Sequence, residues 1–455
     1  MRYKTIYILL IISSLYSQSF FNRVIPEELY FNDAKSMAIG QTMISTGNGS
    51  GMVISNPAML GSHKDGFYVD TNLGFLSLSE RRSIIFKDEW DEALGETDYV
   101  FNQNNSFTHG FGLIYNKTFD IQYLASDKLK ISGAFTSRPY LSLNYNYEEE
   151  IRGDSNLDDG IIGIRDPIVG YQTFSTSGSV DITSIGVSFS LLNKNKKNRN
   201  LSFGISLNNI LDTRITDEIK LIVVDNSYGT ENMSLINDVN TSYLIESDRS
   251  FHTIGFQVPI SNELVLTLSY EENVMISNSN TNFNMNVSNI VGLPQLFGYI
   301  DAELSYLMEG FVYQKPKKKN LGIVYYPKSN INMLLAFEVL NKSWSIDMPG
   351  ADRSINEYKL GFEYAPYNSY PIRAGLVYKE SIFDMVEAIS VLTLGTGLKI
   401  GKIELDLGMN YSTFSYKYID IFPLNDIYSD NCDILNCDNV TENRLIFLTT
   451  IRMEF

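Results

Sequence analysis

The chain has 455 residues, of which 44% are hydrophobic, 20% charged and 13% aromatic. The modest glycine count of 31 excludes a collagen-like chain, and the abundant aromatic residues exclude a disordered one. The formal net charge of −17 provides no basic surface for a nucleic acid, so no nucleic-acid partner is expected. With 2 cysteines and 3 histidines, we expect neither a metal site nor a cofactor.

The first twenty residues have the pattern of a secretory signal. Arg2 and Lys4 precede the apolar stretch Ile6–Leu15, and small residues suited to cleavage follow it. The apolar stretch is too short to span a bilayer comfortably, and no later segment approaches ~20 unbroken apolar residues. We therefore assign residues 1–19 to a signal peptide and expect an exported chain without a transmembrane helix.

From about residue 65 onward, apolar residues alternate with small, polar or charged ones. In 331–339 and again in 403–411, the odd positions are apolar. This period of two predicts half-buried strands. Fourteen such segments start near residues 66, 106, 128, 178, 201, 249, 264, 318, 331, 355, 370, 387, 402 and 443.

The connections between these segments alternate between short and long. Short turns on one side, long polar loops on the other and an even number of strands are typical of an outer-membrane barrel with both termini in the periplasm. We predict an all-β fold: a transmembrane antiparallel outer-membrane β-barrel of about 14 strands over residues 65–455. The longest predicted loops are Glu80–Asn105, Glu148–Thr173, Asp217–Asp248, Asn273–Lys317 and Lys417–Glu442.

A large soluble β-sandwich is the alternative, because it also contains alternating strands. A water-filled or plugged lumen tolerates charged residues on the second face of the strands, whereas a sandwich core does not. The barrel is therefore preferred. Its predicted lumen charges are Glu338, Lys359, Glu363, Arg373 and Lys399.

The last strand is amphipathic and ends on the final residue, Phe455, with Met453 and Ile451 on the same face. It resembles the C-terminal signal of proteins that the outer-membrane assembly machinery inserts. That machinery is therefore an expected partner during insertion, and outer-membrane lipid is the expected surroundings.

Two stretches resemble a known family. Lys35–Gly40 followed by Thr46–Leu60, with the motif Asn56-Pro57-Ala58, resembles the N-terminal plug of the FadL/TodX-type (OMPP1) outer-membrane transport family. Met59 replaces the glycine usual in that motif. The resemblance implies a plug over residues 20–64.

The second stretch is Leu334–Tyr378, where Leu360–Tyr364 and Ile372–Gly375 resemble a hairpin of the same family. Glu363 and Arg373 are equidistant from the turn, so they should face each other on neighbouring strands inside the barrel. An ion pair in the lumen is the favoured interpretation, ahead of a ligand contact.

The resemblance implies passive uptake of hydrophobic molecules, such as long-chain fatty acids, with capture by outside loops and release past the plug. Apolar clusters within Asn273–Lys317 suit capture, although packing against neighbouring loops is equally compatible. Lys359, Arg373, Lys379 and Lys399 could hold a carboxylate. The predicted capture residues are Leu293, Leu296, Phe297, Tyr299, Ile300, Leu307 and Phe311.

Other signals are weaker. Cys432 and Cys437 lie close together in the last predicted outside loop, where an oxidising setting favours a disulfide. A docking role in a type-nine-like secretion shuttle is the alternative function, because apolar outside loops would serve it equally. A lipid hydrolase is disfavoured, because it would need one of His63, His109 or His252 beside a nucleophile. No enzyme activity is expected.

Overall fold

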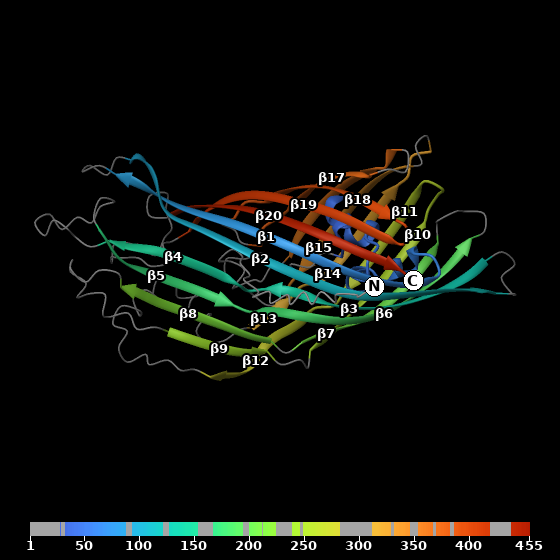
Figure 1. Cartoon of the computed structure of the whole chain (residues 1–455), viewed down its shortest axis with the longest axis horizontal. Helices are drawn as coiled ribbons and strands as arrows, with labels where there is room; N and C mark the ends of the chain where they lie inside the picture. Colours follow the sequence, from blue (N-terminus) through green and yellow to red (C-terminus); the bar gives the residue numbers. More distant parts are fainter. Residues whose placement is uncertain are drawn as a thin grey trace, which may run out of the picture.

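The computed structural model describes residue 28 and residues 32–87, 93–121, 127–152, 167–193, 200–211, 213–223, 239–245, 249–282, 312–328, 332–345, 354–366, 370–382, 386–418 and 438–455. The barrel strands are antiparallel and close on themselves, as predicted (Figure 1). In barrel order they are β1 (Gly66–Lys87), β2 (Ala93–Asp120), β3 (Asp127–Ser142), β6 (Ser179–Asn193), β7 (Leu201–Ile210), β10 (Ser250–Pro259), β11 (Leu264–Glu271), β14 (Lys317–Tyr325), β15 (Met333–Ser343), β16 (Ser354–Tyr364), β17 (Ile372–Lys379), β18 (Ile389–Ile400), β19 (Ile403–Tyr418) and β20 (Asp438–Glu454).

The barrel wall carries its apolar side chains on the outside. Along β7, Leu201, Phe203 and Ile205 are exposed, whereas Ser202 and Ser206 are buried. Large apolar side chains are exposed in the same way on the other barrel strands, which suits a hydrocarbon surrounding rather than water. A soluble sandwich would bury these side chains, so that alternative is excluded.

The first and last strands complete the ring. β1 pairs with β20 from Tyr68 opposite Glu454 to Ser83 opposite Asn439. Beyond this ladder, the backbone N–H of Phe455 donates to the carbonyl of Phe67 over 2.9 Å. The C-terminal strand therefore closes the barrel at the end that carries the short turns.

A second sheet of six strands continues from one side of the barrel (Figure 1). Our prediction of long loops was wrong for these segments. In β4 the buried residues are Tyr145, Tyr147 and Glu149. Because one of them is charged, the alternation of apolar and polar residues that identified the other strands is missing here. In sheet order the strands are β13 (Val312–Lys315), β12 (Val274–Asn282), β9 (Val239–Ile245), β8 (Thr213–Val223), β5 (Ile168–Ser177) and β4 (Tyr145–Arg152).

Neighbouring strands bend from the barrel into this second sheet at matching levels. β5 passes into β6 at Gly178, whose φ of +145° favours glycine. A Cβ there would lie 2.7 Å from the carbonyl oxygen of Arg214. The Gly178 N–H donates to the side-chain oxygen of Asn144, which lies between β3 and β4. The bend therefore requires glycine on one strand and is fixed by an amide on the other.

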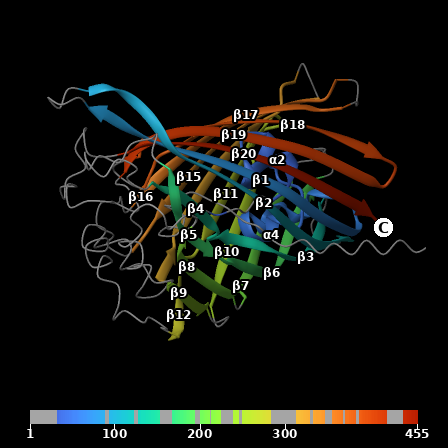
Figure 2. The ribbon, with the colours of Figure 1, turned by 60° about the vertical axis from the view of Figure 1, so that its left-hand side comes forward.

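Residues 32–63, here called the inner segment, lie inside the barrel (Figure 2). They form α2 (Ala34–Ala38), α3 (Met43–Thr46), α4 (Met52–Ser55) and the 3-10 helix η1 (Pro57–Ser62). The Asp33 carboxylate caps α2 by accepting from the Ser36 N–H over 2.7 Å. Within the described ranges, no helix combines the length and the apolar character needed to cross a bilayer.

Candidate functional site

Inward-facing glycines of the barrel wall make room for the inner segment. A Cβ on Gly375 would lie 2.2 Å from the backbone nitrogen of Gly40, and a Cβ on Gly361 would lie 2.2 Å from the carbonyl oxygen of Ile39. On the other side, a Cβ on Gly204 would lie 2.4 Å from the carbonyl carbon of Pro57. The contacts are with backbone atoms, which cannot rotate away, so the inner segment fits only against a wall that lacks side chains here.

Buried polar groups of the wall hold the inner segment in place. One oxygen of Glu338, Oε1, accepts from the N–H of Ser45 over 2.9 Å and from its hydroxyl over 2.6 Å. Asp70 accepts from both the N–H and the hydroxyl of Ser50. Arg138 donates to the Ser50 hydroxyl over 3.0 Å and to the Asn32 carbonyl over 3.1 Å. Each anchor satisfies a backbone or hydroxyl group that burial would otherwise leave unpaired.

The motif Asn56-Pro57-Ala58 shapes the last turn of the inner segment. The Asn56 side chain accepts from the Ala58 N–H over 3.2 Å and donates to the Ile44 carbonyl over 2.9 Å. Pro57 opens η1, where its lack of an N–H costs nothing. The asparagine thus joins α3 to η1.

Charged side chains close the short-turn end beneath the inner segment. Glu363 lies directly opposite Arg373, as the turn spacing predicted, and their side chains are 2.6 Å apart. Arg373 also contacts Asp406 at 2.6 Å, and Lys35 of α2 reaches Glu363 at 3.6 Å. A cavity of about 490 Å³ adjoins this network. Lys399 lines its rim with a side chain that is 58% exposed, so it is not enclosed in the lumen.

His63 gives the inner segment a pH dependence. Burial, and next the charge of Arg452, lower its pKa from 6.5 to about 4, against the bond that its Nε2–H donates to the Asn48 carbonyl. The unfolded chain therefore takes up this proton first as the pH falls. We expect a loss of stability of about 3 kcal/mol between pH 6.5 and 4 that is absent at higher pH.

The measurement is the unfolding midpoint of wild type and His63→Gln from pH 7 to pH 4. Glutamine keeps an N–H donor but does not titrate in this range. The wild-type midpoint should fall more steeply than that of the variant. Parallel pH profiles would show that other groups cause the dependence.

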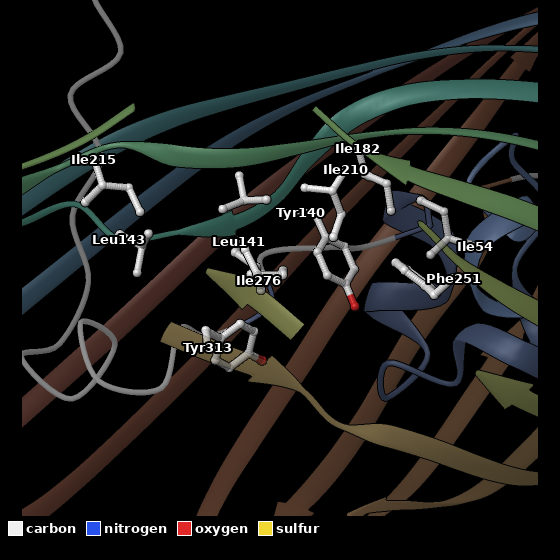
Figure 3. Close-up of a cluster of buried hydrophobic side chains, with 11 residues drawn as sticks. Ile54, Tyr140, Leu141, Leu143, Ile182, Ile210, Ile215, Phe251, Ile276 and Tyr313 are labelled. Atoms are coloured by element: carbon white, nitrogen blue, oxygen red, sulfur yellow. The ribbon is translucent and has the colours of Figure 1, made fainter. Parts of the chain in front are cut away.

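An apolar cluster fills the junction between the barrel and the second sheet. Its side chains come from barrel strands, from the second sheet and from α4, and they gather around a common centre (Figure 3). The described members are fully or almost fully buried. They are Ile54, Tyr140, Leu141, Leu143, Val180, Ile182, Ile210, Ile215, Phe251, Ile276 and Tyr313.

A buried ionic group adjoins this cluster. Lys318 pairs with Glu28 and, at 3.2 Å, with Glu271, which also contacts Lys315 at 2.6 Å. Burial opposes ionisation of Glu28, but Lys318, Lys342 and Lys315 outweigh it and hold its pKa at about 2. Burial lowers the pKa of Lys315 to about 8 despite the attraction of Glu271. These opposed charges bind residue 28, β11, β13 and β14 together.

Next to this group lies a small cavity of about 70 Å³, here called the polar cavity. Its charges balance, because four lysines and four glutamates line it. Lys342 and Lys359 both contact Glu357, at 2.7 and 3.5 Å. The charged residues of the lining are Glu28, Glu271, Glu338, Glu357, Lys318, Lys342, Lys359 and Lys379.

The barrel wall is interrupted between β2 and β3. Their ladder runs only from Phe111 opposite Ser137 to Asp120 opposite Lys128. Beyond it, β2 contacts β4 instead: the Asn104 side chain donates to the Asn146 carbonyl over 3.0 Å. Arg138, which anchors the inner segment, follows Ser137, the last residue of β3 that pairs with β2.

The outer part of the wall encloses a second ionic group. Arg82 is fully buried and lies 2.8 Å from Glu80 and 3.5 Å from Asp438. The Tyr145 hydroxyl donates to Glu80 over 2.8 Å, and the Arg82 guanidinium lies 5.0 Å from the ring centre of Tyr147. This group therefore joins β1 and β20 to β4.

The structure places the predicted lumen residues unevenly. Glu338 and Lys359 lie opposite each other and line the polar cavity, whereas Arg373 and Glu363 belong to the ionic network at the short-turn end. The signal peptide, Cys432 and Cys437 lie outside the described residues. So do the predicted capture residues Leu293, Leu296, Phe297, Tyr299, Ile300, Leu307 and Phe311.

Our reasoning from the sequence missed Asp70 and Arg138. Both are buried on the inward face of strands, so the rule that found Glu338 and Arg373 would have found them in the first strands as well. In the part of the chain that the structure describes, no group of three or more His, Cys, Asp or Glu side chains is placed to hold a metal ion.

Comparison with solved structures identifies similar folds. A FadL homologue from Pseudomonas aeruginosa aligns over 94% of this chain and 100% of its own, with a TM-score of 0.57 and 11% identity. One structure of the Pseudomonas putida toluene transporter TodX covers 93% of this chain and 98% of its own, with a TM-score of 0.51 and 11% identity. A second TodX structure covers 97% of this chain and 100% of its own, with a TM-score of 0.51 and 12% identity. No protein-family model and no curated protein matches the sequence. The likeness is therefore one of fold.

Proposed function

We propose that this chain, an outer-membrane barrel with the FadL/TodX-type fold, carries hydrophobic molecules passively across the outer membrane. The observation that carries the proposal is a closed barrel with an apolar outer wall, whose interior holds a segment fixed by a few polar side chains. Such a wall suits a membrane, and a segment held by a few hydrogen bonds can move aside to open a path. The similar solved structures, a FadL homologue and a toluene transporter, support the same reading.

In this proposal the inner segment is a plug. Ser45 and Ser50 hold it to the wall through Glu338 and Asp70, and backbone atoms fill the space above inward glycines. Hydrogen bonds to a few side chains can exchange without unfolding the barrel. Movement of this segment would therefore open a path inside the barrel while the backbone ladders keep the barrel folded.

The exit we propose is lateral, through the interruption between β2 and β3. Beyond Phe111 no ladder joins β2 to β3, and the side chains of Asn102 and Asn104 bond to the backbone of β4. Arg138 links this place to the inner segment. A hydrophobic cargo leaving sideways enters the bilayer without crossing water, which favours this route over an axial one.

Entry would begin at the predicted capture loop, and both termini would lie in the periplasm with the short turns. Loops that received a protein instead of a lipid would make the chain a docking component of secretion. Its proposed role is transport and not catalysis.

Ligand binding tests the proposal. The mature chain would be purified in detergent, its bound material extracted and identified by mass spectrometry, and displacement of a fluorescent fatty acid measured. We expect co-purified hydrophobic molecules, and a loss of affinity in a variant lacking residues 292–311. A variant that lacks residues 224–238, within the predicted outside loop Asp217–Asp248, is the control. A barrel that binds no lipid probe would make protein docking the better hypothesis.

A further inference from the structure

Four neighbouring strands of the barrel, β19, β20, β1 and β2, continue beyond its apolar outer wall (Figure 1). β1 and β20 stay paired from Phe75 opposite Phe447 to Ser83 opposite Asn439. Phe75 also lies opposite Phe107 of β2, so three rings at one level mark the edge of the apolar wall, as aromatic residues do at membrane interfaces. Beyond this level, most outward side chains of the four strands are polar but uncharged.

One row across these strands, here called the neutral row, consists of uncharged hydrogen-bonding side chains. Its members point outward and are half-buried or exposed. Each lies directly opposite the next on the neighbouring strand, in the order Gln103, Ser79, Asn443 and Thr413. Because neighbouring strands are about 4.8 Å apart, the row extends over about 14 Å of flat surface.

Two exposed aromatic rings flank the neutral row. Phe101, two residues from Gln103 on β2, is 63% exposed. Tyr411, two residues from Thr413 on β19, is 41% exposed, and its hydroxyl donates to Oδ1 of Asn443 over 3.2 Å. The NH₂ group of Asn443 therefore remains available as a donor. A sugar uses both kinds of contact, because its hydroxyls donate and accept hydrogen bonds while the C–H face of its ring packs on an aromatic ring.

The charges around the neutral row do not favour a phosphate as the partner. Arg81 lies on the same face of β1, but it contacts Asp98, which balances its charge. A phosphate is held best by cations that have no such partner. Lys319 of β14 is exposed beyond the apolar wall on another side of the barrel, so the lack of charge is a property of this face and not of the whole rim.

The opposite face of the same sheet is held rigid. Arg82 and Glu80 form their ion pair directly behind it, and Glu442, opposite Glu80, accepts from the Tyr416 hydroxyl over 2.8 Å. A surface that is fixed before binding loses little conformational entropy when its partner arrives. The transport proposal has no use for this outer ionic group, whereas a binding surface on the other side of the sheet does.

We propose that the neutral row and its two flanking rings bind the uncharged sugar units of the glycolipids that surround the barrel. With the short turns in the periplasm, as proposed above, this face lies in the sugar layer that coats the outer leaflet. The face is also continuous with the lipid-facing wall. The acyl chains of the same glycolipid would lie against Phe107 and Phe447, which are 51% and 44% exposed. This role is separate from the passage of a cargo through the interior.

The test is binding of an oligosaccharide to the detergent-purified full chain, measured by surface plasmon resonance. The probe is the oligosaccharide that mild acid releases from the outer-membrane glycolipid of the bacterium that makes this chain, with and without its phosphates. Gln103→Ala/Asn443→Ala removes two hydrogen-bonding groups, so the affinity should fall about tenfold. Phe101→Ala should lower it about fivefold, because a packing surface for the sugar ring is lost.

The matched control is Asn209→Ala, because Asn209 is also an outward, half-buried asparagine but lies on β7, away from the four strands. Its affinity should equal that of wild type, and removal of the phosphates should change nothing. Absence of binding, equal affinities of wild type and the double variant, or binding that requires the phosphates would each overturn the inference. Displacement of the fluorescent fatty acid should be the same in all these variants, so the transport proposal is tested separately.

Discussion

Gly375→Val should expel the inner segment from an otherwise intact barrel. The new side chain would meet the backbone nitrogen and Cα of Gly40 at 2.2 and 2.3 Å, and a backbone cannot rotate out of the way. Valine is well suited to the strand itself. Overpacking of this kind costs about 1–3 kcal/mol. The population in which the inner segment is detached from the wall should therefore rise about tenfold or more.

Thiol labelling measures this release. Ser36→Cys would place a thiol at a fully buried position of α2, in a background in which both native cysteines are replaced by serine. Labelling by a fluorescent maleimide should be about tenfold faster with Gly375→Val. Gly133→Val is the matched control, because no atom lies within 4 Å of a Cβ at that strand position.

Heat-dependent gel mobility would report whether the barrel itself remains folded in both variants. An equal labelling rate with and without Gly375→Val would contradict the close packing of the inner segment on Gly375. Slow labelling in Gly133→Val together with fast labelling in Gly375→Val would show that the packing of the inner segment, and not the folding of the wall, has changed.

Arg82→Met should lower the stability of the barrel by about 3 kcal/mol or more, because it leaves buried carboxylates without their cation. Glu80 would keep the hydroxyl donor Tyr145, and Asp438 would keep Tyr99. Urea unfolding in lipid vesicles, followed by tryptophan or tyrosine fluorescence, measures the loss. The neighbouring variant Arg81→Met is the control.

Arg81 pairs with Asp98 on the surface, where its side chain is 52% exposed. An exposed pair contributes about 1 kcal/mol or less, so this variant should be nearly neutral. Replacing both partners in Glu80→Met/Arg82→Met should recover part of the loss, because no lone charge then remains at that pair. Equal losses in the Arg81 and Arg82 variants would contradict the assignment of a buried ionic group.

The buried ionic group of Arg82 and the inward glycines suit the proposed transport, in which the inner segment moves while the barrel stays folded. The wall is fixed by backbone ladders and by Arg82, whereas the inner segment is held by a few hydroxyl and carboxylate contacts. The interruption beside Arg138 lies where these two systems meet. The contacts that hold the wall and those that hold the inner segment thus lie in different parts of the molecule.

The sequence by itself determined the barrel. A period of two is a local property of the chain, so the alternation in 331–339 or 403–411 identifies strands without knowledge of their neighbours. The distance from a turn likewise predicted that Glu363 faces Arg373. The segments of the second sheet were missed, since β4 buries Glu149 and tyrosines and so lacks the apolar signal.

Only the tertiary structure decided how the interior is arranged. Glu338 bonds to Ser45, which is 293 residues away along the chain, and Gly375 packs against the backbone of Gly40. Both contacts depend on where the inner segment lies in the closed ring. Burial then decides which charges matter, because Lys359 and Lys399 have similar sequence surroundings but only Lys359 is enclosed. Such contacts arise from the closure of the ring, which no local pattern encodes.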